Sequence, residues 1–233
     1  MRALPGCPRR TFQFAGERAH TLSAEILKVQ QQEPEARTIQ YAASFVVRGA
    51  VIGIPTDTFY GLAADPFNLS AVEQIYRIKG RPESRALPIL VNSLEQAVTL
   101  ARDLPATFLM LAEKFWPGAL TLIVDSTHKL PLKVTANTGR VALRWPNSPV
   151  ACAVIQAAGM PVTGTSANVS GFPACSSGDQ VFHQMGDRLP LILDSGDTGA
   201  ALGSTIVELR SEDWRVIREG IITEAEIRDV LGG

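Results

Sequence analysis

Basic side chains gather in two short segments of the sequence. Lys79, Arg81 and Arg85 fall where a predicted helix ends and a loop begins. Arg140 and Arg144 lie on one face of a predicted strand, about 13 Å apart. Cations at a helix end also complement the helix dipole, and a strand face can simply be solvated. Both segments nevertheless supply the ammonium and guanidinium donors that bind phosphates and carboxylates.

Small hydroxyl and amide side chains follow two predicted strands. Residues 55–62, Pro-Thr-Asp-Thr-Phe-Tyr-Gly-Leu, come directly after a buried apolar strand, and Gly61 permits a close approach. Residues 163–171, Thr-Gly-Thr-Ser-Ala-Asn-Val-Ser-Gly, end another strand. Such groups at the edge of a sheet are a common way to bind the polar atoms of a ligand. Ordinary turn chemistry is the alternative for both segments.

Several established catalytic and binding motifs are absent from the sequence. There is no Gly-x-x-x-x-Gly-Lys-Ser/Thr loop and no Gly-x-Gly-x-x-Gly turn after a strand, so side chains would have to hold a nucleotide. A Gly-x-Ser-x-Gly elbow and a plausible Ser/His/Asp arrangement are also lacking. The three cysteines form no Cys-x-x-Cys pair and the three histidines are scattered. We therefore predict neither a disulfide framework nor a dedicated metal site.

The composition is that of an ordinary globular protein. Of 233 residues, 45% are hydrophobic and 19% are charged, which excludes wholesale disorder, collagen and coiled coil. The formal net charge of -1 argues against a bulk nucleic-acid coat. No apolar stretch reaches the roughly 18 residues of a membrane span, and the N-terminus lacks the apolar region of a secretory signal. A cytoplasmic protein is predicted.

Strands and helices alternate along the chain. Strands are predicted at residues 24–29, 50–54, 87–91, 119–124, 141–145, 161–165, 189–193, 205–209 and 214–217. Helices are predicted at residues 38–48, 70–78, 105–115, 149–158, 178–185 and 223–231, with capping boxes at Ser70 and Ser93. Several strands follow one another without a helix. These observations predict an α/β fold, with one twisted, mixed parallel and antiparallel open sheet flanked by helices.

A series of motifs runs through the chain in a recognisable order. The motifs are residues 55–62, Lys79-x-Arg81-Pro82, residues 116–121 (Trp-Pro-Gly-Ala-Leu-Thr), Arg144-x-Pro146, residues 166–171 (Ser-Ala-Asn-x-Ser-Gly), Ser204-Thr205 and Arg218. Together they resemble the YrdC/TsaC family of L-threonylcarbamoyladenylate synthases, whose hallmark is the Lys-x-Arg and Ser-x-Asn pair. We expect residues 1–23 to be a flexible extension and residues 24–233 to be a YrdC-like catalytic domain of the short, single-domain form.

The resemblance implies a nucleotidyltransferase reaction. L-threonine, bicarbonate or CO2, and ATP with Mg²⁺ would give threonylcarbamoyl-AMP and pyrophosphate. The product would pass to a threonylcarbamoyl-transferase complex for t6A modification at position 37 of tRNA. The tRNA itself is a further candidate partner, and no membrane partner is expected.

The resemblance also implies roles for individual residues. Positions that bind L-threonine in the family correspond to Thr58, Arg144, Ser166 and Ser204. Positions that contact ATP or the adenylate correspond to Lys79, Arg81, Arg85, Arg140, Asn168, Ser176 and Arg218. The expected catalytic group is Lys79, Arg81, Ser166 and Asn168. This chain departs from the family at Arg85, Leu90 and Arg140, where Asn or Lys, His, and a small polar residue respectively are more usual.

Two other classes of function remain open from the sequence. The first is a module that binds tRNA or double-stranded RNA on a basic sheet face without catalysis. The neutral total charge and the lack of alternating aromatic and basic residues weigh against it. The second is a carbamoyl-transfer domain like the YrdC-like module of hydrogenase maturation proteins. Those chains are much larger and carry acylphosphatase and zinc-finger segments that this sequence lacks.

Overall fold

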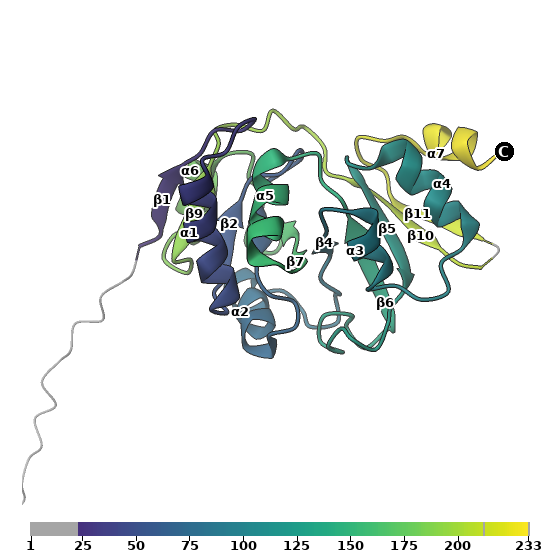
Figure 1. Ribbon diagram of the computed structural model, residues 1–233, viewed down its shortest axis with the longest axis horizontal. Coiled ribbons are helices and arrows are strands. Elements are labelled where there is room, and N and C mark those ends of the chain that lie inside the picture. The colour runs from purple at the N-terminus through teal and green to yellow at the C-terminus, as the bar shows by residue number, and fades with distance from the viewer. Residues whose placement is uncertain (1–22, 212, 233) are drawn as a thin grey trace, which may run out of the picture.

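The strands of the protein divide between two sheets, which lie side by side at the left and right of Figure 1. The computed structural model describes residues 23–211 and 213–232, so the predicted extension lies outside the described residues except for Ser23. The α/β class and the mixture of parallel and antiparallel pairing are confirmed. The division into two sheets differs from the single sheet that was predicted.

The first sheet has five strands. In spatial order they are β1 (Glu25–Lys28), β9 (Leu191–Asp194), β2 (Ile52–Ile54), β3 (Gly61–Ala63) and β8 (Thr165–Ser166). The β1 and β2 strands run parallel to β9, whereas β3 runs antiparallel to β2 and to β8. The sequence did not predict β3, because its residues belong to the segment interpreted as a turn. Its pairing brings residues 55–62 beside residues 163–171.

The second sheet has six strands. In spatial order they are β11 (Trp214–Arg218), β10 (Thr205–Leu209), β5 (Leu120–Asp125), β6 (Arg140–Arg144), β4 (Ile89–Leu90) and β7 (Val162–Thr163). The β10 and β5 strands are parallel, and β6 is antiparallel to β5. Because β6 lies inside this sheet, both ends of the strand are held in register.

Gly164 separates the two sheets at the point where one continuous strand was predicted. The chain pairs with β4 through Thr163 and with β3 from Thr165 onward. A Cβ at residue 164 would lie 2.4 Å from Cγ of the buried Leu90, so a larger residue does not fit there. The composition of residues 161–165 predicts a strand, but it carries no information about which strand lies beside it.

Helices pack on both sheets and join them through a shared apolar core. The helices are α1 (Ala36–Val47), α2 (Leu69–Lys79), α3 (Leu94–Val98), α4 (Ala106–Phe115), α5 (Pro149–Ala158), α6 (Gly178–Met185) and α7 (Glu224–Leu231). The α1 and α5 helices cover one face of the first sheet (Figure 1). Buried residues of α2, α4 and α6 form the larger core, which runs from the first sheet to the second. Among the described helices, none is long and apolar enough to cross a membrane.

The start of α2 differs from the predicted capping box at Ser70. The side chain of Asn68 accepts hydrogen bonds from the backbone N–H groups of Ser70 and Ala71, so the helix begins at Leu69. Asparagine is as good an N-cap as serine, and its place two residues earlier adds about half a turn to the helix. The predicted cap at Ser93 is confirmed, because its hydroxyl accepts from the Gln96 N–H.

The connection from β9 to β10 crosses from one sheet to the other, and Tyr60 anchors its beginning. The buried Tyr60 hydroxyl lies 2.8 Å from the Gly196 carbonyl oxygen and accepts a hydrogen bond from the Ser195 N–H. Asp194 also lies 3.1 Å from this hydroxyl and forms an ion pair with Lys28. This connection leads directly to Ser204, one of the predicted binding residues.

Candidate functional site

Arg144 lies buried at the end of β6, where three segments meet. Its side chain donates from Nη2 to Asp57 Oδ1 at 2.6 Å, from Nη1 to Thr58 Oγ1 at 2.9 Å and from Nε to the Gly118 carbonyl at 3.0 Å. The residue is 6% exposed. Burial lowers the pKa of Arg144, and the charge of Asp57 opposes that shift. A buried, fully positioned guanidinium of this kind is suited to bind one carboxylate group.

The local sequence explains why Thr58 faces Arg144. Pro55 follows β2 and cannot donate to a strand ladder, so the chain leaves the sheet there. Thr56 then closes a turn, because its hydroxyl accepts from the Thr58 N–H at 3.1 Å and donates to the Phe59 carbonyl at 2.7 Å. The turn directs the side chains of Asp57 and Thr58 to the end of β6.

Gly118 supplies the third acceptor for the Arg144 side chain. Its N–H donates to the Trp145 carbonyl at 2.8 Å, and a Cβ at this position would lie 2.4 Å from the Phe115 carbonyl oxygen. The Trp-Pro-Gly motif therefore places a backbone acceptor against the Arg144 Nε.

Lys79, the last residue of α2, is the centre of a second polar network. Gly80 ends the helix in the left-handed conformation, and the Lys79 side chain turns inward until the residue is 2% exposed. Its ammonium group donates to the carbonyls of Ser166 and Asn168 and lies 3.4 Å from Asn168 Oδ1. The Ser166 hydroxyl donates to the same Oδ1. The Lys-x-Arg and Ser-x-Asn motifs thus form one hydrogen-bonded unit.

The environment of Lys79 makes its ammonium group unusually acidic. Burial lowers the pKa of Lys79 to about 8, and the positive charge of Arg81 acts in the same direction. Arg81 itself is partly buried and donates from Nη2 to the Ala86 carbonyl at 2.8 Å. Arg85 is exposed in the same loop. Two cations held close together in this way are arranged for a polyanionic ligand.

Arg218 and Ser204 extend the site toward the second sheet. Arg218 donates from Nη2 to the Ser204 carbonyl at 2.7 Å, and the Ser204 hydroxyl lies 2.9 Å from Thr121 Oγ1. Burial lowers the pKa of Arg218, and the nearby charge of Arg144 lowers it further. The two guanidinium groups bind adjacent segments, because the Thr205 N–H, next to Ser204, donates to the carbonyl of Ala119, next to Gly118. We use the term basic cluster for Lys79, Arg81, Arg144 and Arg218.

The pairing of β3 with β8 joins the networks around Lys79 and Arg144. Gly61 lies opposite Ser166 in this pair, and Thr58 stands three residues before Gly61. The predicted site residues Thr58, Lys79, Arg81, Arg144, Ser166, Asn168, Ser204 and Arg218 thus lie around the junction of the two sheets. Ser176 follows the buried Cys175, whose thiol lies close enough to Lys79 for the lysine charge to act on its pKa.

Arg140 is not brought into the same contacts. Its Nη1 donates to Asp125 at 2.9 Å, its Nε lies 3.4 Å from Glu208, and its Nη2 donates to the carbonyls of Ile123 and Leu209. The prediction that Arg140 and Arg144 form one anion-binding face therefore differs from the structure. The period of a strand places two residues on one face, but it does not show which carboxylates the neighbouring strands supply.

Three residues that contact the site had no assigned role in the sequence analysis. They are Asp57, Gly118 and Thr121. Each stands inside a motif that carried the resemblance, and this position was the available signal. Only the folded chain shows that Asp57 and Gly118 bind Arg144 while Thr121 contacts Ser204.

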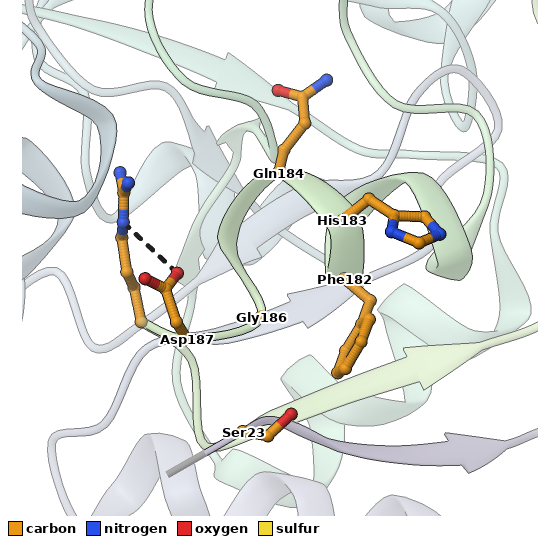
Figure 2. Close-up of a pocket in the computed structure, with 7 residues that line it drawn as sticks. Ser23, Phe182, His183, Gln184, Gly186 and Asp187 are labelled. Carbon is orange, nitrogen blue, oxygen red and sulfur yellow. Dashed lines mark ion pairs between the residues drawn. The ribbon is translucent and has the colours of Figure 1, made fainter. Parts of the chain in front are cut away.

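A cavity of about 460 Å³ lies elsewhere, at the carboxyl end of α6 (Figure 2). Ser23, Phe182, His183, Gln184, Gly186, Asp187 and Arg188 line it. Asp187 forms an ion pair with Arg188, and Figure 2 shows Asp187 on one side of the view and the His183 ring on the other. None of these residues is a predicted site residue. Within residues 23–211 and 213–232, no three His, Cys, Asp or Glu side chains are grouped so that they could hold a metal ion.

Comparisons with known proteins agree with the sequence motifs. A family model, Sua5_yciO_yrdC, described as "Telomere recombination", matches residues 44–220. The threonylcarbamoyl-AMP synthase of Pyrococcus abyssi is 34% identical over 207 residues, which cover 89% of this chain and 61% of that protein. A putative threonylcarbamoyl-AMP synthase of Mycobacterium tuberculosis is 36% identical over 200 residues, which cover 86% of this chain and 92% of that protein.

The fold of this chain is also similar to that of a solved structure. The crystal structure of P. abyssi Sua5 complexed with L-threonine superposes with a TM-score of 0.87 at 33% identity, covering 90% of this chain and 61% of that one. The chain thus spans about three fifths of the P. abyssi relative. The family match, the identity to both relatives and the common fold establish that the chain belongs to the Sua5/YciO/YrdC family, as its motifs predicted.

Proposed function

We propose that this chain is a threonylcarbamoyl-AMP synthase, a nucleotidyltransferase that makes threonylcarbamoyl-AMP and pyrophosphate from L-threonine, bicarbonate or CO2, and ATP. The observation that carries the proposal is the junction of two differently built anion sites. The buried guanidinium of Arg144 suits a carboxylate, and the group around Lys79 and Arg81 suits a polyphosphate. The names of the P. abyssi and M. tuberculosis relatives support the same reaction.

Arg144 would bind the carboxylate of L-threonine. A guanidinium has five N–H donors, and three of those of Arg144 are used by Asp57, Thr58 and Gly118. Two donors remain for the amino acid. The hydroxyl groups of Thr58, Ser166 and Ser204 would hold the rest of the substrate. Selection against valine requires a hydrogen bond to the threonine hydroxyl, because shape alone separates such isosteres poorly.

The triphosphate of ATP would lie against the other cations. Lys79 and Arg81 would neutralise its charge, and the remaining contacts would come from Arg85, Asn168, Ser176 and Arg218. Mg²⁺ would enter with the substrate as MgATP. We leave Arg140 out of this subsite, because Asp125 and Glu208 already bind its guanidinium.

The reaction would proceed by attack of a carbamate on phosphorus. The threonine amine first adds CO2 and loses a proton, giving an N-carboxylate. One carboxylate oxygen then forms a bond to the α-phosphorus of ATP, and the bond to the bridging oxygen of pyrophosphate breaks. Because the nucleophile is already an anion, this step needs in-line positioning and charge neutralisation more than a strong base. The basic cluster supplies both.

The product would be handed to a threonylcarbamoyl-transferase that modifies tRNA. Threonylcarbamoyl-AMP is a mixed anhydride, so it must be consumed soon after release. We place this exchange in the cytoplasm, and direct contact of this chain with tRNA belongs to the same proposal.

Binding of ATP should take up a proton at alkaline pH. The pKa of Lys79 is about 8 in the free chain, so most molecules carry a neutral amine at pH 8.5. The phosphate charge favours the ammonium form, so ATP binding should draw in roughly three quarters of a proton per chain at that pH. Calorimetric titration in buffers of different ionisation enthalpy measures this uptake. The variant Lys79→Met should show none, and equal uptake in both proteins would contradict the assignment.

The same lysine affects folding with a defined sign. Its pKa is lowered from 10.5 to about 8 on folding, so between these pH values the unfolded chain binds the proton more tightly. The contribution of Lys79 to the free energy of unfolding therefore rises with pH across that window.

Pyrophosphate release tests the proposed function. Release from ATP should require both L-threonine and bicarbonate, and omission of either should reduce it to the background rate. Release that continues without threonine would exclude the proposed reaction. Binding of tRNA that weakens with salt, in the absence of any ATP turnover, would favour the RNA-binding alternative.

A further inference from the structure

Asp57 forms an ion pair with Arg144, one member of the basic cluster. Its Oδ1 lies 2.6 Å from Arg144 Nη2, and the two side chains are 15% and 8% exposed. Within the described part of the chain, Lys79, Arg81 and Arg218 form no ion pair with any Asp or Glu side chain. Asp57 thus neutralises Arg144 alone and leaves the other cations of the cluster with their full charge.

This arrangement divides the cluster into two parts of different net charge. The Arg144–Asp57 pair carries no net charge, but two N–H donors of its guanidinium remain free. Lys79, Arg81 and Arg218 keep a net positive charge, and they bind only carbonyl oxygens, the Ser204 hydroxyl and the Asn168 amide. Repulsion by a fixed carboxylate grows in proportion to the charge of the ligand, and it is strong where water is excluded.

The two proposed substrates differ in the negative charge of the groups that would bind here. The carboxylate of an amino acid has a single negative charge, whereas phosphate and triphosphate groups carry several. A site that contains four cations needs some means of keeping the polyanion away from the position of the monoanion. A neutral ion pair with free donors accepts a carboxylate through hydrogen bonds and offers a phosphate no net attraction.

We propose that Asp57 is a specificity-determining residue that reserves Arg144 for a monocarboxylate ligand and excludes phosphate groups from it. The inference rests on the proposed function for the identity of the monocarboxylate, L-threonine. Asp57 would not touch the reacting atoms. The negative charge of Asp57 would determine which ligands Arg144 binds. Loss of this charge should change the selectivity for carboxylate over phosphate more than it changes the fold.

Binding of L-threonine in competition with inorganic phosphate tests this role. Threonine is titrated calorimetrically into the chain without ATP, at rising phosphate concentration and at ionic strength held constant with KCl. In the wild type, the Kd for threonine should stay constant. In Asp57→Asn, which keeps the shape and an acceptor for Arg144 but removes the charge, phosphate should raise the apparent Kd at least tenfold.

Two further variants separate the charge from other effects. Asp57→Glu keeps a carboxylate at this position, so its Kd for threonine should be independent of the phosphate concentration, as in the wild type. Asp187→Asn removes the same charge from an exposed ion pair with Arg188, at the carboxyl end of α6, and should behave as the wild type.

The possible outcomes are distinct. If Asp57→Asn binds threonine with no sensitivity to phosphate, the inference is overturned. If that variant loses threonine affinity equally at every phosphate concentration, Asp57 only holds Arg144 in place, and the inference is again overturned. If the wild type binds no threonine at all, the proposed function itself fails.

Discussion

Replacing Arg144 with alanine should raise the KM for L-threonine by about 100-fold, which corresponds to about 2.7 kcal/mol. Truncating one partner of a buried, hydrogen-bonded charge pair typically costs about 2–5 kcal/mol of binding energy. The variant should lose affinity for threonine rather than for ATP. The Arg144 guanidinium contacts Thr58, Asp57 and Gly118. Lys79 and Arg81, which would bind ATP, have other hydrogen-bond partners. The KM for ATP should change by less than about threefold. Steady-state kinetics with each substrate varied in turn measures both constants.

The controls for this variant use other basic residues. Arg144→Lys keeps the charge but loses the planar donor fork, so its KM for threonine should fall between those of the wild type and Arg144→Ala. Arg215→Ala removes an exposed arginine that pairs with Glu208 at 2.9 Å and should leave both KM values unchanged. Equal increases in the KM of threonine and of ATP in Arg144→Ala would show that Arg144 does not bind the carboxylate.

Replacing Lys79 with methionine should reduce the turnover number by about 30- to 1000-fold, or about 2–4 kcal/mol of transition-state stabilisation. The ammonium group lies against the Ser-x-Asn segment with little water around it, where a charge acts strongly on a developing anion. Methionine has a similar length and no charge, so it fills the same space. Pyrophosphate release at saturating substrate concentrations measures the effect.

The stability of Lys79→Met must be compared with that of the wild type in a separate measurement. Loss of the ammonium removes a desolvated cation but leaves the carbonyls of Ser166 and Asn168 without this donor. These two effects oppose each other, and the melting temperature reports their balance. Lys133→Met is the matched control, because Lys133 binds Glu73 and Glu83 outside the basic cluster. Near-normal turnover in Lys79→Met would remove Lys79 from the catalytic group.

Much of the site could be predicted because its residues stand in short, continuous motifs. The contacts of Lys79 with Ser166 and Asn168, and of Arg144 with Thr58, join residues that the motifs had already singled out. A motif identifies the chemistry of each segment. The distance between segments depends on strand pairing, and the pairing of Gly61 with Ser166 has no signature in either segment.

The features that were predicted wrongly also depend on strand pairing, which the local sequence does not show. The composition of residues 161–165 correctly predicted strand structure, but Gly164 divides them between two sheets because Leu90 leaves no room for a Cβ. Arg140 and Arg144 do share β6, yet Asp125 of the adjacent β5 and Glu208 of β10, the next strand beyond β5, bind Arg140. Local sequence determines which element forms. Partners on other strands determine what each side chain does.

Asp57 illustrates how a side chain that contacts the candidate site can escape prediction from the sequence. An aspartate beside two threonines after a proline is ordinary turn chemistry, and nothing near it in the sequence is basic. Its contact with Arg144 joins residues that are 87 positions apart. Only the folded chain shows that one carboxylate neutralises one of the four cations.

The proposed reaction joins threonine, CO2 and the AMP part of ATP into one molecule and releases pyrophosphate. Incubation of the wild-type chain with ATP, L-threonine and ¹³C-labelled bicarbonate, followed by mass spectrometry, tests it most directly. The expected result is threonylcarbamoyl-AMP whose mass is higher by one unit than that of the unlabelled product, formed together with an equal amount of pyrophosphate. Formation of AMP or ADP with no ¹³C-labelled adduct of threonine would contradict the claim.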